Sequence, residues 1–400
     1  MYRFLLDQRM RRGTDVFELR LPGRRVIGMG GAQAAQLFYD QTRFSREGAI
    51  PKAVQKALVG VGGVHMLDGL EHGTRKAAFI EAINETSVSR LAELAAWSWN
   101  DAIREWRGNV VLFDEAAKVL ARTVTLWAGA PFPTAGPDTL ATKLIAMVDG
   151  FGTLGPRHWR GRIARAETEM WATKVIVDAR AGRIYAPADS AVQIMASQPL
   201  APRVAAVELL NIIRPTTAVA WYITFIAHAF AMHPEWRENL NESNVNAFVQ
   251  EVRRYYPLAP FIAARVSRDF DWNGVAFRRG NVALLDIYGT NRDPDLWERP
   301  DRFSPERFLL GHAHTGFGFI PQGGGDVATG HRCPGEPVTL ALMEQAALLL
   351  SRLDYAVPPQ DLAIRLNRVP ARVESGFIMS LGQAVGRTRL PGAVEPPRPW

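Results

Sequence analysis

The stretch that decides the fold is Phe319-Ile-Pro-Gln-Gly-Gly-Gly-Asp-Val-Ala-Thr-Gly-His-Arg-Cys-Pro-Gly-Glu336. Five of its residues between positions 323 and 335 are glycines, which let a backbone curl tightly and approach a flat ligand closely. Cys333 stands directly before a helix that the apolar spacing predicts for Glu336–Leu353. Backbone N–H groups at the start of a helix lower the pKa of a nearby thiol, so we expect a thiolate at Cys333.

Cys333 is the only cysteine among the 400 residues, which excludes an internal disulfide and zinc sites that need several thiolates. A lone cysteine is most often a buried, inert thiol, and no local pattern pairs it with the histidine and acid of a protease. The glycines, the neighbouring His331 and Arg332, and the following helix favour a third interpretation, an axial ligand of haem iron.

Two further motifs precede the cysteine. Glu251-Val-Arg-Arg254 places an acid and an arginine on one helix face, which alone indicates only a solvated ion pair. Pro305-Glu-Arg-Phe308 follows, and Cys333-Pro-Gly335 completes the series. In this order the motifs resemble those of the cytochrome P450 superfamily. The resemblance implies haem b (iron protoporphyrin IX), with Cys333 as the axial ligand of the iron, and a structural triad of Glu251, Arg254 and Arg307.

The cysteine loop departs from the usual pattern of that superfamily. An aromatic residue usually stands seven positions before the cysteine and an arginine two before, where this chain has Asp326 and His331. The loop with its Gly323-Gly-Gly triplet is similar to the bacterial fatty-acid peroxygenase branch, over about Phe17 to Ile378. This resemblance implies that hydrogen peroxide is the co-substrate and that no redox partner is required. Long-chain fatty acids would be hydroxylated at the α or β carbon or decarboxylated to terminal alkenes.

Arg214 is physically unusual, because it lies in the strongly apolar segment 204–232 and is followed by Pro215, which removes a backbone hydrogen bond. A buried guanidinium needs a partner, either an internal carboxylate in a salt bridge or a ligand carboxylate held in its fork. The resemblance implies the second partner, with a fatty-acid carboxylate on Arg214 acting as general base and acid toward peroxide. Thr216 and Thr217 leave a conventional proton relay open.

Gly60-Val-Gly-Gly-Val-His-Met-Leu-Asp-Gly-Leu-Glu-His72 is the next informative stretch. The resemblance places His65 beside the haem, where it donates a proton or hydrogen bond or orients the carboxylate; a histidine satisfied within a turn is the alternative. The implied haem contacts are Gln322 and, at the propionates, Arg46, His72 and Lys76. The implied acyl tunnel, equally compatible with plain core, comprises Val59, Val148, Phe151, Leu258, Ala259 and Phe261.

The apolar periodicity predicts a mainly α (α+β) chain, and the resemblance implies the cytochrome P450 fold with haem between a long central helix and the cysteine loop. No repeat or linker interrupts residues 1–385, which predicts one haem-thiolate domain, followed by a proline-rich, disordered tail over 386–400. The other predicted helices are 87–106, 112–127, 163–181, 204–232 and 244–256, with a further one from Gly31, and the strands are 15–21, 25–29, 261–266 and 281–287.

Charge and hydropathy exclude some functions. The formal charge is +7, but no Lys/Arg run is long enough to indicate nucleic-acid binding. Phe4–Leu6 is too short for a secretory segment, and Ala218–Met232 falls short of the ~20 residues of a spanning helix. We therefore expect a soluble, cytoplasmic protein without a membrane anchor.

Two other functions stay open. A conventional monooxygenase would take electrons from an acidic ferredoxin or flavodoxin, which the sequence pI of about 9.7 would suit. A non-catalytic haem or fatty-acid sensor would bind the same ligands without forming a product.

Overall fold

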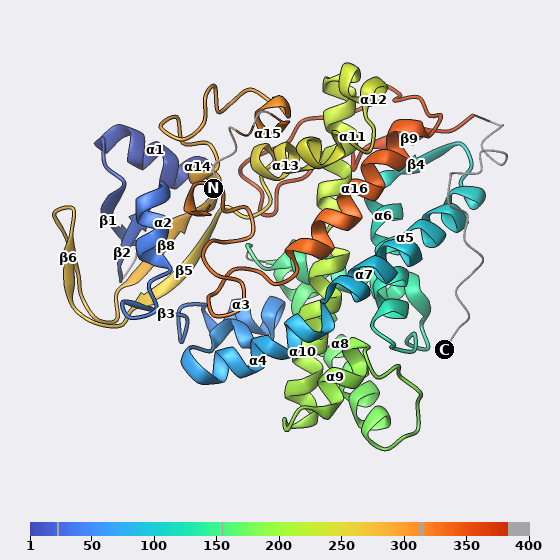
Figure 1. The fold of residues 1–400 in the computed structure, drawn as a ribbon, viewed down its shortest axis with the longest axis horizontal. Helices are drawn as coiled ribbons and strands as arrows, with labels where there is room; N and C mark the ends of the chain where they lie inside the picture. Colours follow the sequence, from blue (N-terminus) through green and yellow to red (C-terminus); the bar gives the residue numbers. More distant parts are fainter. Residues whose placement is uncertain (22–23, 154, 310, 312–315, 383–400) are drawn as a thin grey trace.

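The computed structural model describes residues 1–21, 24–153, 155–309, 311 and 316–382. Figure 1 shows a part built around a β-sheet on the left and a larger, helical part on the right. The predicted tail 386–400 lies outside the described residues, and the division at residue 385 stays a prediction. The predicted helix-rich fold with small sheets is confirmed.

The main sheet has five strands in the order β1-β2-β8-β5-β3. β1 (Val16–Leu21) and β2 (Arg24–Met29) form an antiparallel hairpin, and β2 runs parallel to β8 (Val282–Asp286). β5 (Phe261–Val266) pairs antiparallel with β8 and carries β3 (Phe44–Ser45) at the edge. The sheet thus joins the start of the chain to a segment some 230 residues later, and all four predicted strands are present.

Short strands and helices complete the fold. Two small antiparallel sheets pair β4 (Asn109–Val111) with β9 (Ile378–Ser380) and β6 (Phe270–Trp272) with β7 (Val275–Phe277). The helices on the sheet side and around the cysteine are α1 (Arg3–Arg12), α2 (Ala32–Phe38), α14 (Ile287–Thr290), α15 (Glu306–Leu309) and α16 (Glu336–Arg352). The helical part contains α3 (Lys52–Val54), α4 (Gly69–Ala82), α5 (Glu85–Glu105), α6 (Leu112–Trp127), α7 (Gly136–Gly150), α8 (Pro156–Arg180), α9 (Ala191–Ser197), α10 (Pro202–Thr217), α11 (Ala220–Met232), α12 (Pro234–Asn239) and α13 (Val245–Tyr255). A π-helix (Gln55–Val59) and two 3₁₀ turns (Val64–Met66 and Gly316–Gly318) lie between them.

The central helix is not continuous, so the prediction of one helix over 204–232 is wrong. α10 ends at Thr217 and α11 begins at Ala220, along nearly the same axis in Figure 1. Pro215 has no N–H to donate, and the Thr216 and Thr217 hydroxyls donate to the Ile212 and Ile213 carbonyls at 2.9 and 3.1 Å. The Val219 and Trp221 N–H groups then make the shorter i→i+3 bonds, to Thr216 and Ala218, and the helix is broken after Thr217.

Taken together, Pro202–Met232 is long and apolar enough to cross a membrane, although 89% of its most apolar window is buried inside the protein. α10 packs against α6, α7, α8 and α9, and α11 packs against α6, α13 and α16. The apolar surface of both helices is therefore covered by other helices.

Three of the helices that were not predicted from the sequence have ten or more residues. α7 carries Leu140, Leu144, Met147 and Val148 at helical spacing and buries all four, so its pattern was detectable. α4 buries charged side chains among its apolar ones, and α1 is short and rich in arginine, so neither has an apolar stripe that identifies it.

His228 in α11 gives the protein a sensitivity to acid. Its Nδ1 lies 2.8 Å from the Tyr256 hydroxyl, and burial lowers its pKa to about 4. Because the unfolded value is about 6.5, the unfolded chain binds a proton first, and stability falls as pH drops below 6.5. Between pH 7 and 5 we expect the wild-type protein to lose about 2 kcal/mol more unfolding free energy than His228→Gln. Denaturant titrations at both pH values measure this, and identical pH dependence would contradict it.

Candidate haem and fatty-acid site

The candidate site is a cavity of about 380 Å³ between α10 and the cysteine loop. Its lining comes from the end of α10, the Val64–Met66 turn, α4, α7 and the segment that leads into α16. Cys333 and Arg214 line the same cavity. The fold therefore brings the two most unusual residues of the sequence together.

Cys333 is held by the protein backbone on the cavity wall. Its N–H donates to the Gln322 carbonyl at 3.1 Å, and the Gln322 Nε2 lies 3.8 Å from its Sγ. The Gly335 N–H lowers the pKa of the thiol, as predicted, but burial outweighs it and raises that pKa overall. The predicted lowering by a backbone N–H at the start of the helix is thus present and is opposed by burial, and a thiolate at Cys333 stays a prediction.

The glycine triplet serves packing within the protein. A Cβ on Gly323, whose φ is +93°, would lie 2.8 Å from the Tyr39 hydroxyl, and one on Gly324 would lie 2.8 Å from the Phe317 ring. Of the five glycines only Gly335 lines the cavity. The tight loop thus fits against the Tyr39 and Phe317 side chains, and the expected close approach to a flat ligand stays a prediction.

Arg214 is buried, with 7% of its surface exposed, and lines the cavity. Among the described residues, none forms a hydrogen bond or ion pair with its guanidinium, and its Nε is buried without a partner. Burial, followed by the nearby charge of Arg165, lowers the pKa of Arg214 to about 9, so the group stays charged at neutral pH. Because no carboxylate in the described part of the chain pairs with Arg214, a ligand carboxylate is the partner that fits.

Pro215, next to Arg214, also lines the cavity, and so does Thr216. The Thr216 hydroxyl donates to the Ile212 carbonyl, as the Thr217 hydroxyl does to that of Ile213. Both hydroxyl protons are therefore engaged by the helix backbone and are not directed at a ligand.

His65 lies on the Val64–Met66 turn and lines the cavity. Its side chain is exposed to the cavity, and desolvation by the protein atoms around it, followed by the charge of Arg214, lowers the pKa of His65 to about 3. The ring is thus neutral at pH 7. It has one N–H to donate, but it does not carry the extra proton of an imidazolium.

The turn with His65 lies close against α10 because it is rich in glycine. Gly60 has φ +79°, and a Cβ there would lie 2.3 Å from the Arg165 Nη2 and 2.6 Å from a Val207 methyl group. A Cβ on Gly63 would lie 2.9 Å from the Asn211 Nδ2. These two glycines allow the backbone of the turn to contact α10 and α8 directly.

Four basic side chains line the cavity around the cysteine: His72, Lys76, His331 and Arg332. The His72 and His331 rings lie 4.1 Å apart, and the Nδ1 of His72 is buried without a partner. Burial lowers the pKa of His72 to about 4 and that of Lys76 to about 8. Lys76 Nζ donates to the Arg332 carbonyl at 2.7 Å and to that of Gly330.

Arg46 lies outside this group. Its guanidinium donates to the Ala263 carbonyl at 3.1 Å and lies 4.4 Å from the centre of the Phe38 ring. Asp68 accepts hydrogen bonds from the Arg46 N–H and from His331. Arg46 is therefore not among the residues that line the cavity, and its predicted propionate contact stays a prediction.

The predicted tunnel residues divide into two groups. Val148, Phe151, Leu258 and Ala259 line the cavity, whereas Val59 and Phe261 are not among its lining residues. Leu58, next to Val59 in the same π-helix, lines the cavity instead. Several side chains that line the cavity were not predicted from the sequence: Phe79, Ile83, Asn211, Ile212, Val219, Tyr222, Val338 and Pro370. Asn211 was detectable, since it precedes Arg214 by three residues on one helix face.

Glu251, Arg254 and Arg307 meet in the interior. The Glu251 Oε2 lies 2.7 Å from the Arg254 Nε and 3.2 Å from the Arg307 Nε. The side chains of Glu251 and Arg254 are fully buried, and the Ser304 N–H donates to the Glu251 Oε1 at 2.8 Å. Such a group is costly to break, by roughly 3–5 kcal/mol, because an uncompensated charge would stay buried.

The residues present fit a haem. Arg214 Nε and His72 Nδ1 are buried polar atoms without described partners, and the half-buried Cys333 thiol is contacted by the Gly335 N–H and, at 3.8 Å, by the Gln322 Nε2. A thiolate is a suitable axial ligand for haem iron, and the basic side chains beside it suit two propionates. Cys333 would hold the iron, Gln322 would lie beside the sulfur, and His72 and Lys76 would meet the propionates.

Comparisons with known proteins agree with this site. A family model described as Cytochrome P450 matches residues 233–365. Cytochrome P450 4A11 of Homo sapiens is 26% identical over 195 residues, 43% of this chain and 36% of that protein. (+)-Menthofuran synthase of Mentha piperita is 31% identical over 140 residues, 34% of this chain and 27% of the synthase. The chain thus spans only about a third of the length of these curated relatives.

Solved structures match over nearly the whole chain. Cytochrome P450SP alpha (CYP152B1) in complex with (R)-ibuprofen is 43% identical, with 95% of this chain and 96% of that chain covered and a TM-score of 0.92. Cytochrome P450EX alpha (CYP152N1) with myristic acid is 38% identical, with 95% and 94% covered and a TM-score of 0.92. A variant of cytochrome P450 OleT in complex with arachidonic acid is 33% identical, with 96% and 95% covered and a TM-score of 0.90.

The fold and the site define a haem-thiolate protein, and the chain belongs to the cytochrome P450 family. Within that family its similarity is to CYP152 proteins, which confirms the predicted resemblance to the bacterial fatty-acid peroxygenase branch.

The close contact of Gly60 with α8 and α10 predicts the effect of adding one methyl group. We expect Gly60→Ala to lower the unfolding free energy by about 2–4 kcal/mol, because backbone strain adds to overpacking. Gly62→Ala is the matched control, since Gly62 has φ +82° but its nearest neighbour is 3.8 Å away. It should cost only about 1 kcal/mol. Denaturant unfolding measures both, and equal losses would contradict the described contact.

Proposed function

We propose that this protein is a haem-thiolate peroxygenase that uses hydrogen peroxide to oxidise long-chain fatty acids at the α and β carbons. The single observation that carries the proposal is a buried, unpaired Arg214 lining the same cavity as Cys333. Haem bound through the Cys333 thiolate supplies the oxidising chemistry, since electron donation from sulfur favours cleavage of the O–O bond.

Arg214 binds and orients the substrate. Its guanidinium presents parallel N–H donors that match the two oxygens of a carboxylate. No described side chain neutralises Arg214, so the fatty-acid carboxylate serves as its counter-ion. The ion pair compensates for the hydration that the carboxylate loses when it enters the cavity. Fixing the head group also keeps the α and β carbons nearest to the reacting centre, so the distal tail is not oxidised.

The bound carboxylate performs the proton transfers. It takes a proton from one oxygen of hydrogen peroxide and returns it to the other, acting first as general base and then as general acid. The protein itself offers no described acid in this position, and the hydroxyl protons of Thr216 and Thr217 are engaged by backbone carbonyls. This observation favours the peroxygenase over a conventional monooxygenase, which needs a protein-borne proton relay and a redox partner.

His65 supports the same step as a neutral ring. Its N–H donates a hydrogen bond toward the carboxylate or the peroxide, and its low pKa keeps it from competing as a base near pH 7. The position of this donor influences whether the products are hydroxy acids or terminal alkenes that are one carbon shorter.

The acyl chain extends along apolar side chains of the cavity wall. Val148, Phe151, Leu258 and Ala259 supply this surface, with Phe79 and Val338. Burial of methylene groups contributes about 0.8 kcal/mol for each, which favours long chains over short ones. Similar solved structures hold myristic acid and arachidonic acid, which supports a fatty acid as the ligand.

Arg214→Ala tests the proposal. We expect kcat/KM for peroxide-driven oxidation of a long-chain fatty acid to fall at least about 100-fold, since the charge-assisted fork is lost. The fatty-acid-induced change of the haem spectrum should disappear as well. Arg214→Lys should recover part of the binding but little turnover, because an ammonium does not form the fork. Products are quantified by mass spectrometry without any reductase.

Arg162→Ala is the matched control, because Arg162 lies on the outer surface of α8 and does not line the cavity. It should leave turnover unchanged. Full peroxide-driven activity in Arg214→Ala would refute the substrate-assisted mechanism, and wild-type turnover that requires a reductase would favour the conventional monooxygenase.

A further inference from the structure

Glu208 is a fully buried carboxylate that lies outside the cavity lining, in α10 and six residues before Arg214. Its Oε1 accepts the Val64 N–H at 2.8 Å and the Arg75 Nη1 at 2.6 Å. Its Oε2 accepts the Asn211 Nδ2 at 3.0 Å. Burial raises the pKa of Glu208, and these hydrogen bonds oppose that rise.

These contacts join three elements. Arg75 belongs to α4, Val64 begins the 3₁₀ turn that carries His65, and Glu208 lies on the same helix as Arg214. Arg75 also donates to the Gly62 carbonyl at 3.3 Å, so the ion pair holds the turn at two backbone groups. We call Glu208 and Arg75 together the carboxylate clamp.

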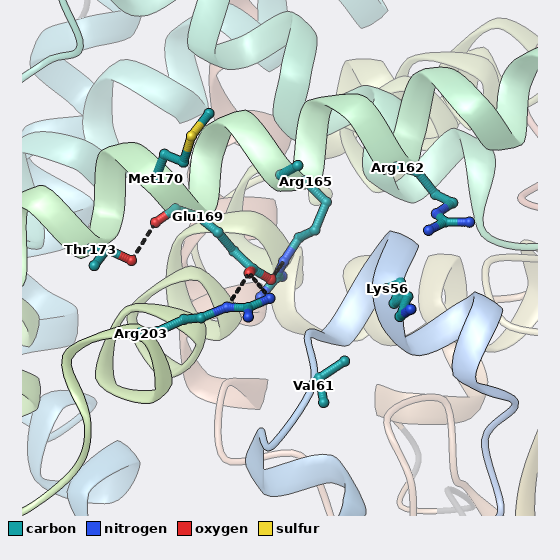
Figure 2. Close-up of a pocket in the computed structure, with 9 residues that line it drawn as sticks. Lys56, Val61, Arg162, Arg165, Glu169, Met170, Thr173 and Arg203 are labelled. Carbon is teal, nitrogen blue, oxygen red and sulfur yellow. Dashed lines mark hydrogen bonds and ion pairs between the residues drawn. The ribbon is translucent and has the colours of Figure 1, made fainter.

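A second contact holds the start of the same segment from α8. Arg165 Nη1 donates to the Leu58 carbonyl at 2.8 Å, and its Nε lies 2.7 Å from the Glu169 Oε1. Figure 2 shows Arg165 and Arg203 both directed toward Glu169, beside Val61, at a groove on the outer side of α8. This contact fixes the segment near Leu58, whereas the carboxylate clamp acts on the residue next to His65.

We propose that Glu208 is a positioning residue, which holds the turn that carries His65 at a fixed place relative to Arg214 and thereby sets the partition between hydroxylation and decarboxylation. This inference rests on the proposed function, because the partition concerns its two products. One hydrogen bond from the adjacent residue restrains the His65 backbone, and displacement of a reacting group by about 1 Å can change a rate about 100-fold.

The variants separate the clamp from the stability of the fold. The double variant Arg75→Met/Glu208→Met removes the clamp without leaving an unpaired buried charge. Glu208→Gln keeps an acceptor oxygen for the Val64 N–H, and rotation of the Asn211 amide offers its unpartnered Oδ1 to the new NH₂ group. Glu71→Gln is the surface control, since Glu71 pairs with Arg75 from outside at 3.5 Å.

Hydrogen exchange of the holoenzyme tests the restraint without reference to activity. In the double variant we expect the Val64 amide to exchange at least about tenfold faster, because its acceptor is lost. In Glu208→Gln and Glu71→Gln it should stay within about twofold of the wild-type rate. Peptides from α11 should be unchanged in all of them, which shows that the fold is intact. An unchanged Val64 rate in the double variant would refute the clamp.

Product analysis with peroxide and a long-chain fatty acid tests the consequence. The double variant should shift the ratio of alkene to hydroxy acid about tenfold, in the same direction as His65→Ala, with KM within about twofold. Added to His65→Ala, it should cause no further shift, because both changes remove the same interaction. The positioning role would be overturned if the double variant kept the wild-type product ratio. It would also be overturned if the double variant shifted the ratio as much in the His65→Ala background as in the wild-type background.

Failure of the proposed function is recognised separately. If the wild-type protein forms no product, the peroxygenase proposal fails, and the exchange rates still show whether Glu208 restrains the turn. If the wild-type protein is active and only the ratio stays constant, the positioning role alone is refuted.

Discussion

The site depends on one uncompensated charge, the buried guanidinium of Arg214. A charged group inside a protein is costly unless a counter-ion satisfies it, and the described part of the chain supplies none. The helix that carries Arg214 is stabilised by packing against four other helices, which keeps the charge in place without its partner. A carboxylate that enters the cavity is therefore bound by the protein and completes the electrostatics at the same time.

α10 carries two buried charged side chains, Glu208 and Arg214, on nearby turns. Glu208 is charge-paired, has no contact with the cavity and restrains the turn of His65, whereas Arg214 lines the cavity and has no described partner. The break after Thr217 follows from Pro215, and it leaves the cation at the end of a rigid helix. α10 thus carries Arg214 and, through Glu208, accepts the backbone N–H of the residue next to His65.

In the cysteine loop, glycines that were expected to approach a ligand pack against protein side chains. Its sequence reads as a loop shaped around a ligand, but Gly323 and Gly324 are required by the neighbouring Tyr39 and Phe317 side chains. Burial raises the pKa of the thiol, whereas the Gly335 N–H and the charge of Lys76 lower it. A glycine near a ligand site therefore indicates close packing, but the sequence does not show whether the close neighbour is a protein side chain or a ligand.

The sequence by itself determined the helix-rich class, the four predicted strands, Cys333 as the haem ligand candidate and Arg214 as the anomalous charge, because periodicity and local motifs are properties of neighbouring residues. The tertiary structure decided what lies around them. The missing counter-ion of Arg214, the neutral state of His65, the place of Arg46 outside the cavity and the contacts of Glu208 each depend on residues far apart in the chain. Burial and hydrogen-bond partners arise only when such segments pack together, so no local pattern specifies them.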